Sequence, residues 1–161
     1  VELDSVVAHS LEQFEAPRKL SKLAFNEDET IPADLRGPRV SSATWKYTSG
    51  AVGSLMHVIA LHGRDFFTEI DVFADGYSSR LVDAYYAPTL YLRRPGDDHE
   101  EVYKYADDDP FFSEVSSMID AVEDPSKSDE ILCSFDDAAH TYAFTWAIRR
   151  ACETQVDRRR R

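Results

Sequence analysis

The sequence is poor in the features that nucleic-acid-binding and membrane-spanning proteins need. Its 18 lysine and arginine residues stand against 30 aspartate and glutamate residues, giving a formal charge of −12. Affinity for phosphate comes from lysine and arginine, so we expect neither a nucleic acid nor an anionic membrane as partner. No apolar run approaches the roughly 20 residues of a spanning helix. The N-terminal residues also lack the pattern of a secretory signal, and we expect a cytoplasmic protein.

Glycine, cysteine and histidine are also scarce, and none of them follows a cofactor or metal motif. Gly50 and Gly53 are expected in a turn between two strands, whereas a dinucleotide loop joins a strand to a helix. Cys133 and Cys152 fit no zinc or redox spacing, and the five histidines show no metal-ligand spacing. No Gly-x-Ser-x-Gly segment occurs. We therefore predict no metal site, no catalytic residue and no cofactor bound by this chain.

Aromatic residues are plentiful, with nine Phe, eight Tyr and two Trp, so the chain can build a hydrophobic core. Its 161 residues suffice for one domain, which we place at residues 1–153, followed by a frayed basic tail at residues 154–161. Residues 14–40 hold three of the seven prolines and are expected to form a long loop. Such loops inside compact domains are usually functional.

The middle of the chain alternates apolar and polar residues with a period of two, which is typical of strands. Short connections such as Asp75-Gly76 are too brief for parallel crossovers, so the strands should be antiparallel. The expected strands cover residues 3–11, 43–48, 52–62, 67–74, 79–86, 89–93 and 101–105.

The last third is expected to be helical. Asp109 and Pro110 form a typical helix start, and apolar residues then recur at helical spacing until Pro125. Ser134 and Asp137 resemble a capping box that opens a second helix, which should end near Glu153.

Together these elements predict an α+β domain, a predominantly antiparallel open-faced sheet with helices on one face. We expect Trp146 to lie in the core between the second helix and the sheet. The opposite sheet face would be apolar and bare, and such faces mark interfaces. Trp45, Tyr47 and Phe73 are its candidate residues.

Three segments resemble the glucose–fructose oxidoreductase/inositol dehydrogenase (Gfo/Idh/MocA) family, closest to its uncharacterised fungal members. The hairpin Trp45–His57 is similar to that family's aromatic strand, glycine turn and strand. Asp109–Ala121 resembles its "Asp-Pro-Phe-x-x-Glu" helix, and Ser134–Arg149 resembles its closing "Ser-x-x-Asp-Ala-x-x-Thr-Tyr…Trp-x-Ile" helix. The order and spacing of the three segments carry the resemblance, which spans residues 40–153.

The resemblance implies an N-terminal Rossmann domain that binds NAD or NADP, joined to a C-terminal α+β domain. The Rossmann domain and the family's catalytic Glu-Lys-Pro are missing from this sequence. Because the chain starts at Val1 without methionine and ends abruptly in Arg161, we expect a fragment that is inactive alone. The resemblance also implies a homodimer through the open sheet face. It assigns the long loop to the substrate, where the candidate contacts are Arg18, Lys19, Arg36 and Arg39.

Three functions remain open at this stage. The first is the substrate-binding and dimerisation domain of an NAD(P)-dependent oxidoreductase acting on a sugar, polyol or dihydrodiol. The second is a stand-alone, non-enzymatic binding or scaffold domain that dimerises through its sheet. The third is a free-standing α+β enzyme working in a cavity between sheet and helices. A nucleotide-binding domain encoded before Val1 would distinguish the first from the others.

Overall fold

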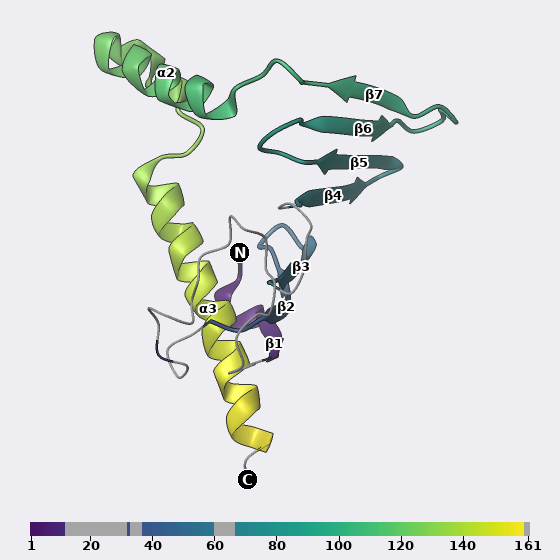
Figure 1. Ribbon diagram of the computed structural model, residues 1–161, viewed down its shortest axis with the longest axis vertical. Coiled ribbons are helices and arrows are strands. Elements are labelled where there is room, and N and C mark those ends of the chain that lie inside the picture. The colour runs from purple at the N-terminus through teal and green to yellow at the C-terminus, as the bar shows by residue number, and fades with distance from the viewer. Residues whose placement is uncertain (12–31, 33–36, 60–66, 160–161) are drawn as a thin grey trace. The chain divides into compact units, whose positions relative to one another are not determined.

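The computed structural model describes residues 1–11, 32, 37–59 and 67–159, which fall into two compact units (Figure 1). The first unit combines Val1–Arg64 with Cys133–Arg161, and the second is Asp65–Leu132. Each unit contains an antiparallel sheet and at least one helix, which confirms the predicted α+β class. Where we expected one sheet, the described residues form two, of three and four strands.

The first unit is a three-stranded sheet with a long helix across one face (Figure 1). A 3-10 turn, η1 (Leu3–Ser5), leads into β1 (Val7–Leu11). β2 (Val40–Lys46) and β3 (Val52–Val58) follow in the order β1-β2-β3, and the helix is α3 (Phe135–Arg159).

The strand register places small side chains and one large one under α3. Ala8 pairs with Ala43, and Trp45 pairs with Gly53, so their side chains share one face. The core joins this face to Ile148 and Cys152 of α3, and the rings of Trp45 and Phe144 lie 4.7 Å apart, edge to face. A Cβ at Gly53 would overlap the Trp45 indole, so only glycine leaves room for the ring. The sequence therefore buries one tryptophan by placing glycine directly across from it.

Our placement of Trp45 and Tyr47 on the open sheet face is wrong. Trp45 is buried against α3, and Tyr47, two residues later, contacts the Trp45 ring at 6.2 Å. The two-residue period correctly put both side chains on one face. It did not indicate which face the helix covers, because both faces of this sheet are rich in apolar residues.

The second unit is a four-stranded meander followed by two helical segments. Its strands β4 (Glu69–Ala74), β5 (Tyr77–Val82), β6 (Thr89–Arg93) and β7 (Glu101–Lys104) pair in sequence order. Asp75 and Gly76 join β4 to β5 with positive φ angles of 41° and 86°, as the predicted tight turn requires. α2 (Pro110–Glu123) and the 3-10 segment η3 (Pro125–Glu130) complete the unit.

Both predicted helix starts are confirmed. The Asp109 carboxylate accepts a hydrogen bond from the Phe112 backbone N–H at 3.0 Å. The Asp137 carboxylate accepts from the Ser134 hydroxyl at 2.6 Å, and the Asp137 N–H donates back to that hydroxyl at 3.2 Å. α3 continues to Arg159, six residues past its expected end, so part of the predicted frayed tail is helical.

Candidate functional site

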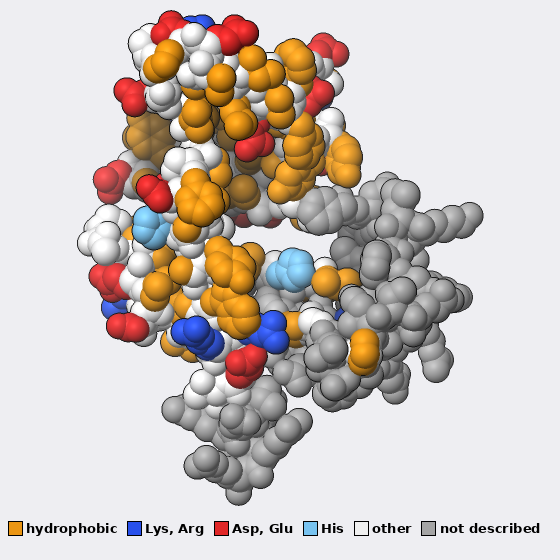
Figure 2. Space-filling model, turned by 90° about the vertical axis from the view of Figure 1, so that its left-hand side faces the viewer, with side chains coloured by type: hydrophobic (Ala, Val, Ile, Leu, Met, Phe, Trp, Pro, Cys, Tyr) orange, Lys and Arg blue, Asp and Glu red, His pale blue; other side chains and the backbone are white. Residues whose placement is uncertain are grey.

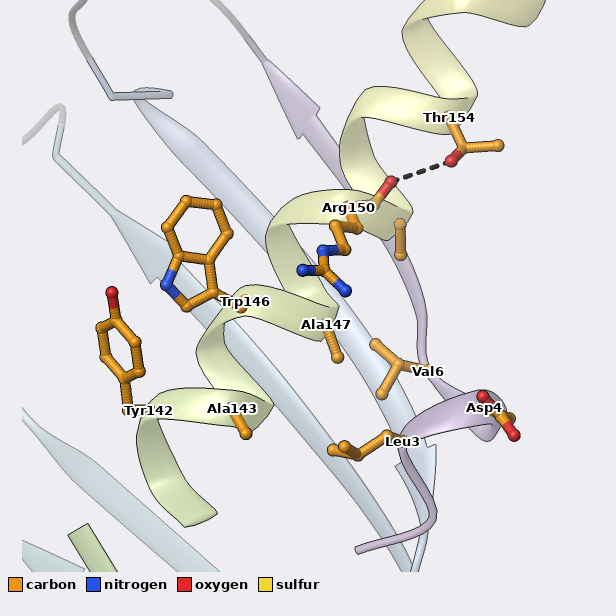
Figure 3. A pocket seen from close by; sticks show the side chains of 10 residues that line it. Leu3, Asp4, Val6, Tyr142, Ala143, Trp146, Ala147, Arg150 and Thr154 are labelled. Atoms are coloured by element: carbon orange, nitrogen blue, oxygen red, sulfur yellow. Dashed lines mark hydrogen bonds between the residues drawn. The ribbon is translucent and has the colours of Figure 1, made fainter. Parts of the chain in front are cut away.

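An open groove runs along α3 on the side that faces η1 (Figure 3). Its volume is about 690 Å³. Alanines spaced four residues apart on α3 lie along it, and Leu3 and Val6 face them across the groove. The lining residues are Leu3, Asp4, Val6, Tyr142, Ala143, Trp146, Ala147, Arg150, Ala151 and Thr154.

Hydrogen bonds to the end of β2 fix the wall that η1 contributes. The Glu2 N–H donates to the Lys46 carbonyl at 2.9 Å, and the Lys46 N–H donates to the Ser5 hydroxyl at 2.8 Å. These two bonds tie the start of the chain to a strand more than 40 residues away. The groove is therefore held by the sheet of the first unit and does not depend on α3 alone.

Trp146 lines this groove, and our prediction that it belongs to the core is wrong. Its side chain remains 38% exposed. Its ring meets Tyr142 edge to face at 6.2 Å, and the Arg149 guanidinium lies 5.1 Å from the ring centre. Tyr142 and Trp146 project to one side of α3, away from Leu3 and Val6 (Figure 3).

The chemistry of the groove is that of a binding surface. It carries one carboxylate, Asp4, one guanidinium, Arg150, and the Thr154 hydroxyl, which donates to the Arg150 carbonyl at 2.9 Å. Nucleophilic catalysis needs a nucleophile within hydrogen-bond reach of a base, and the lining residues contain no such pair. The groove offers shape and apolar contact without a reacting group.

A second candidate site is the face of the three-stranded sheet that points away from α3. The register places Val7 and Leu11 of β1 on this face, beside Val52, Met56 and Val58 of β3. All five are exposed, from 41% for Val58 to 72% for Val52. The other residues of the face are His9, Val40, Ser42, Thr44, Lys46 and Ser54.

This open face carries no acidic side chain, although the chain has 30 acidic residues. Its one formal charge is Lys46, at the end of β2. A second surface of the same kind can approach it without repulsion between carboxylates, which is the electrostatic condition for self-association. The open face is thus apolar, exposed and free of the charge that dominates the rest of the protein.

The structure places only part of the expected site residues. Arg18, Lys19 and Arg36 lie outside the described residues. Arg39 is buried next to the start of β2. Its backbone N–H donates to the Leu11 carbonyl at 3.0 Å, and its backbone carbonyl accepts from the Ile59 N–H at 2.7 Å. Its side chain therefore belongs to the interior of the first unit.

Phe73, the third candidate for the open face, lies in the second unit. Its side chain is 77% exposed, on a face of the four-stranded sheet that it shares with Asp71 and Arg80. The five exposed residues of the three-stranded sheet were missed as interface candidates. The signal that could have found them is the alternation of Val7, His9 and Leu11 with the small residues Ala8 and Ser10.

The dinucleotide expected for the intact protein does not fit the described part of this chain. The described glycines lie in turns, strands or irregular chain, and Gly50, Gly76 and Gly96 have positive φ angles. None of them opens a helix, where a pyrophosphate is bound by free N–H groups. The described residues also bring together no group of three metal-ligating side chains. Within the same residues, no helix has both the length and the apolar character needed to cross a bilayer.

Comparison with known proteins finds similarity to one family model and to two fungal proteins. Residues 1–77 match the family model described as "Putative oxidoreductase C terminal domain". Two uncharacterised proteins of the fission yeast Schizosaccharomyces pombe are 43% and 38% identical to the chain over 94% and 92% of its length. The chain spans only 37% and 38% of the length of these two relatives. No solved structure matches.

These similarities support the coarser part of the sequence-based assignment: residues 1–77 are similar to an oxidoreductase C-terminal domain, and the chain has uncharacterised fungal relatives. The family model covers the hairpin Trp45–His57 that carried the first part of the resemblance, and both relatives extend over nearly the whole chain. The assignment to the Gfo/Idh/MocA family is finer than this match and stays a prediction.

Proposed function

We propose that this chain is the substrate-binding and dimerisation domain of an NAD(P)-dependent oxidoreductase that acts on a sugar, polyol or dihydrodiol. The observation that carries the proposal is the match of residues 1–77 to an oxidoreductase C-terminal domain, in a chain that spans 37–38% of its relatives. The remaining length of such a protein is where a nucleotide-binding domain would lie. The present chain would then supply substrate contacts and symmetry, while the cofactor supplies the hydride chemistry.

Because the proposal assigns substrate binding to this chain and cofactor binding to another domain, the intact protein and the isolated chain should behave differently. The intact protein should catalyse saturable reduction of NAD or NADP with at least one member of a panel of sugars, polyols and dihydrodiols. The isolated chain should show neither this activity nor dinucleotide binding by calorimetric titration, because its described residues offer no glycine-rich helix start and the chain carries a charge of −12. An intact protein inactive with every compound, or a chain that binds dinucleotide at micromolar concentration, would refute the proposal.

For substrate contacts we propose the long loop, with Arg18, Lys19 and Arg36 as the side chains that reach the substrate. Guanidinium and ammonium groups donate several hydrogen bonds to hydroxyl or carboxylate oxygens. Arg39 lies next to the start of β2, and its burial there favours a structural role in the first unit. Replacing Arg18 or Arg36 by glutamine should raise the Michaelis constant of the intact enzyme, whereas a loss of soluble protein alone would argue for a structural role.

For dimerisation we propose the open face of the three-stranded sheet. Two copies related by a two-fold axis would pack this face on itself, burying Val7, Val52 and Met56 against their counterparts. Met56→Glu would place two carboxylates near the axis and should weaken the dimer more than about tenfold, equivalent to about 1.4 kcal/mol. Analytical ultracentrifugation of the isolated chain over a concentration series measures this change.

Two further variants locate the interface. Tyr86→Glu adds the same charge at a side chain of similar exposure, 73% against 66% for Met56, in a loop outside both sheets. It should leave the dimer intact. Phe73→Glu tests the candidate on the four-stranded sheet. A monomeric parent chain, or a dimer that only Phe73→Glu disrupts, would refute the assignment to the three-stranded sheet.

A further inference from the structure

The second unit contains a helix whose apolar side is uncovered. Large apolar residues of α2 recur at helical spacing and occupy a single sector of its circumference. Their exposed fractions range from 53% to 74%, and Figure 2 shows hydrophobic side chains gathered over this helix at the top of the molecule. The six residues are Phe111, Phe112, Val115, Met118, Ile119 and Val122.

The other side of α2 is already used. Ala121, its only buried residue, lies outside the apolar sector, and α2 contacts η3 of the same unit. Lys127 of η3 reaches Asp120 of α2 at 3.5 Å. The contact with η3 therefore fixes which side of α2 remains for another partner.

The four-stranded sheet of the same unit has an apolar face of matching character. The register places Ile70, Leu81, Leu90 and Tyr103 in one row across all four strands. Val72 and Leu92 lie in the adjacent row, and Ala74 and Tyr77 extend the face. We call these eight residues, with Ser79 and Glu101, the apolar face of β4–β7.

Charge does not oppose a helix on this face. Glu101, its only charged residue, accepts a hydrogen bond from Arg94 Nε at 2.7 Å and another from the Tyr103 hydroxyl. These two donors hold the pKa of Glu101 below its ordinary value, so the carboxylate stays ionised, and the Arg94 guanidinium balances its charge. Of the acidic residues of α2, Asp120 lies away from the apolar sector, whereas Glu114 and Glu123 lie at its two borders.

We infer that α2 closes onto the apolar face of β4–β7 of its own chain, with the segment between Tyr105 and Asp109 as the hinge. The 14 residues of α2 span about 21 Å, and four strands are about 19 Å wide, so one helix covers the sheet. The first turn of α2 already contacts the loop between β5 and β6, because the Phe111 ring stacks on the Tyr85 ring with 6.0 Å between their centres. The Tyr105 N–H donates to the Pro88 carbonyl at 2.9 Å and holds the hinge at the sheet. This inference is independent of the proposed enzyme activity.

A pair of introduced cysteines tests the closure in the full 161-residue chain. Met118→Cys places one thiol within the apolar sector at the mid-length of α2, and Leu81→Cys places the other on β5 within the apolar face. Cys133→Ser removes the exposed native thiol, and Cys152 stays buried in the core of the first unit. A short bis-maleimide should link the two introduced cysteines within one chain, as identified by peptide mass spectrometry of the monomer band.

The control exchanges Leu81→Cys for Arg80→Cys, the preceding residue of β5, whose side chain lies on the opposite face. The first pair should react at least about tenfold faster than the control pair, because closure raises the effective concentration of one thiol near the other. Equal rates would overturn the inference. A link found only in covalent dimers would also overturn it, because α2 would then cover the sheet of a second copy.

Discussion

Replacing Trp45 by alanine removes an indole that fills the space between Gly53 and α3. The ring is buried, lies 4.7 Å from the ring of Phe144 and belongs to the same cluster as Ile148. Removing a buried tryptophan leaves a cavity and typically costs about 3–5 kcal/mol. Gly53, directly across from Trp45, has no side chain to fill that cavity. We therefore expect the full cost of the cavity.

Trp146→Ala is the matched comparison, because it removes the same type of side chain from α3, on the face of that helix that does not pack against Trp45. Trp146 is 38% exposed, and its defined partners are the Tyr142 ring and the Arg149 guanidinium. A cation–π contact at an exposed site contributes about 0.5–1 kcal/mol. We expect this variant to lose about 1 kcal/mol of unfolding free energy.

Thermal unfolding followed by far-ultraviolet circular dichroism separates the two variants. For a chain of this size, 1 kcal/mol corresponds to about 2–4 °C in melting temperature, so Trp45→Ala should melt about 6–20 °C below the parent. Trp146→Ala should melt within about 4 °C of it. Each variant also retains one tryptophan, and the emission of Trp45 should lie to the blue of that of Trp146. Equal destabilisation by the two substitutions, or red-shifted emission from Trp45, would refute the placement of α3.

Three further predictions concern the glycine under Trp45 and the two helix starts. Gly53→Val should destabilise the first unit by about 1–3 kcal/mol in urea unfolding, because the valine Cβ would overlap the Trp45 ring. An unchanged free energy of unfolding would mean that the Trp45 ring does not pack over residue 53. Asp109→Ala should cost about 1 kcal/mol by removing the cap of α2, whereas Asp108→Ala, the neighbouring control, should cost little if the cap is correctly assigned. The Ser134 hydroxyl and N–H hold the pKa of Asp137 below its ordinary value, so its stabilisation of α3 should be complete above the ordinary pKa of about 3.9. This stabilisation should disappear as the pH falls through the lowered pKa of Asp137, and the helix content should fall with it. Asp137→Asn should flatten this dependence of helix content on pH. An acid transition unchanged in the variant would contradict the assigned cap.

The amino-acid sequence determined the local elements of this protein. Two-residue alternation and turn residues such as Asp75-Gly76 place the strands, and β6 lies at the residues expected for it. Asp109 with Pro110, and Ser134 with Asp137, mark both helix starts, because a cap depends on residues only three positions apart.

Only the tertiary structure decided which side of each element is buried. α3 carries two apolar stripes, one through Tyr142 and Trp146 and one through Phe144 and Ile148, and helical spacing alone cannot rank them. The choice is made by Gly53, since a glycine across from Trp45 leaves space for an indole on one face of the sheet. That pairing joins two strands, and its consequence reaches a helix about 90 residues further along the chain. Local sequence patterns do not contain such long-range contacts. The groove beside Trp146 and the open face around Met56 could therefore be located only in the tertiary structure.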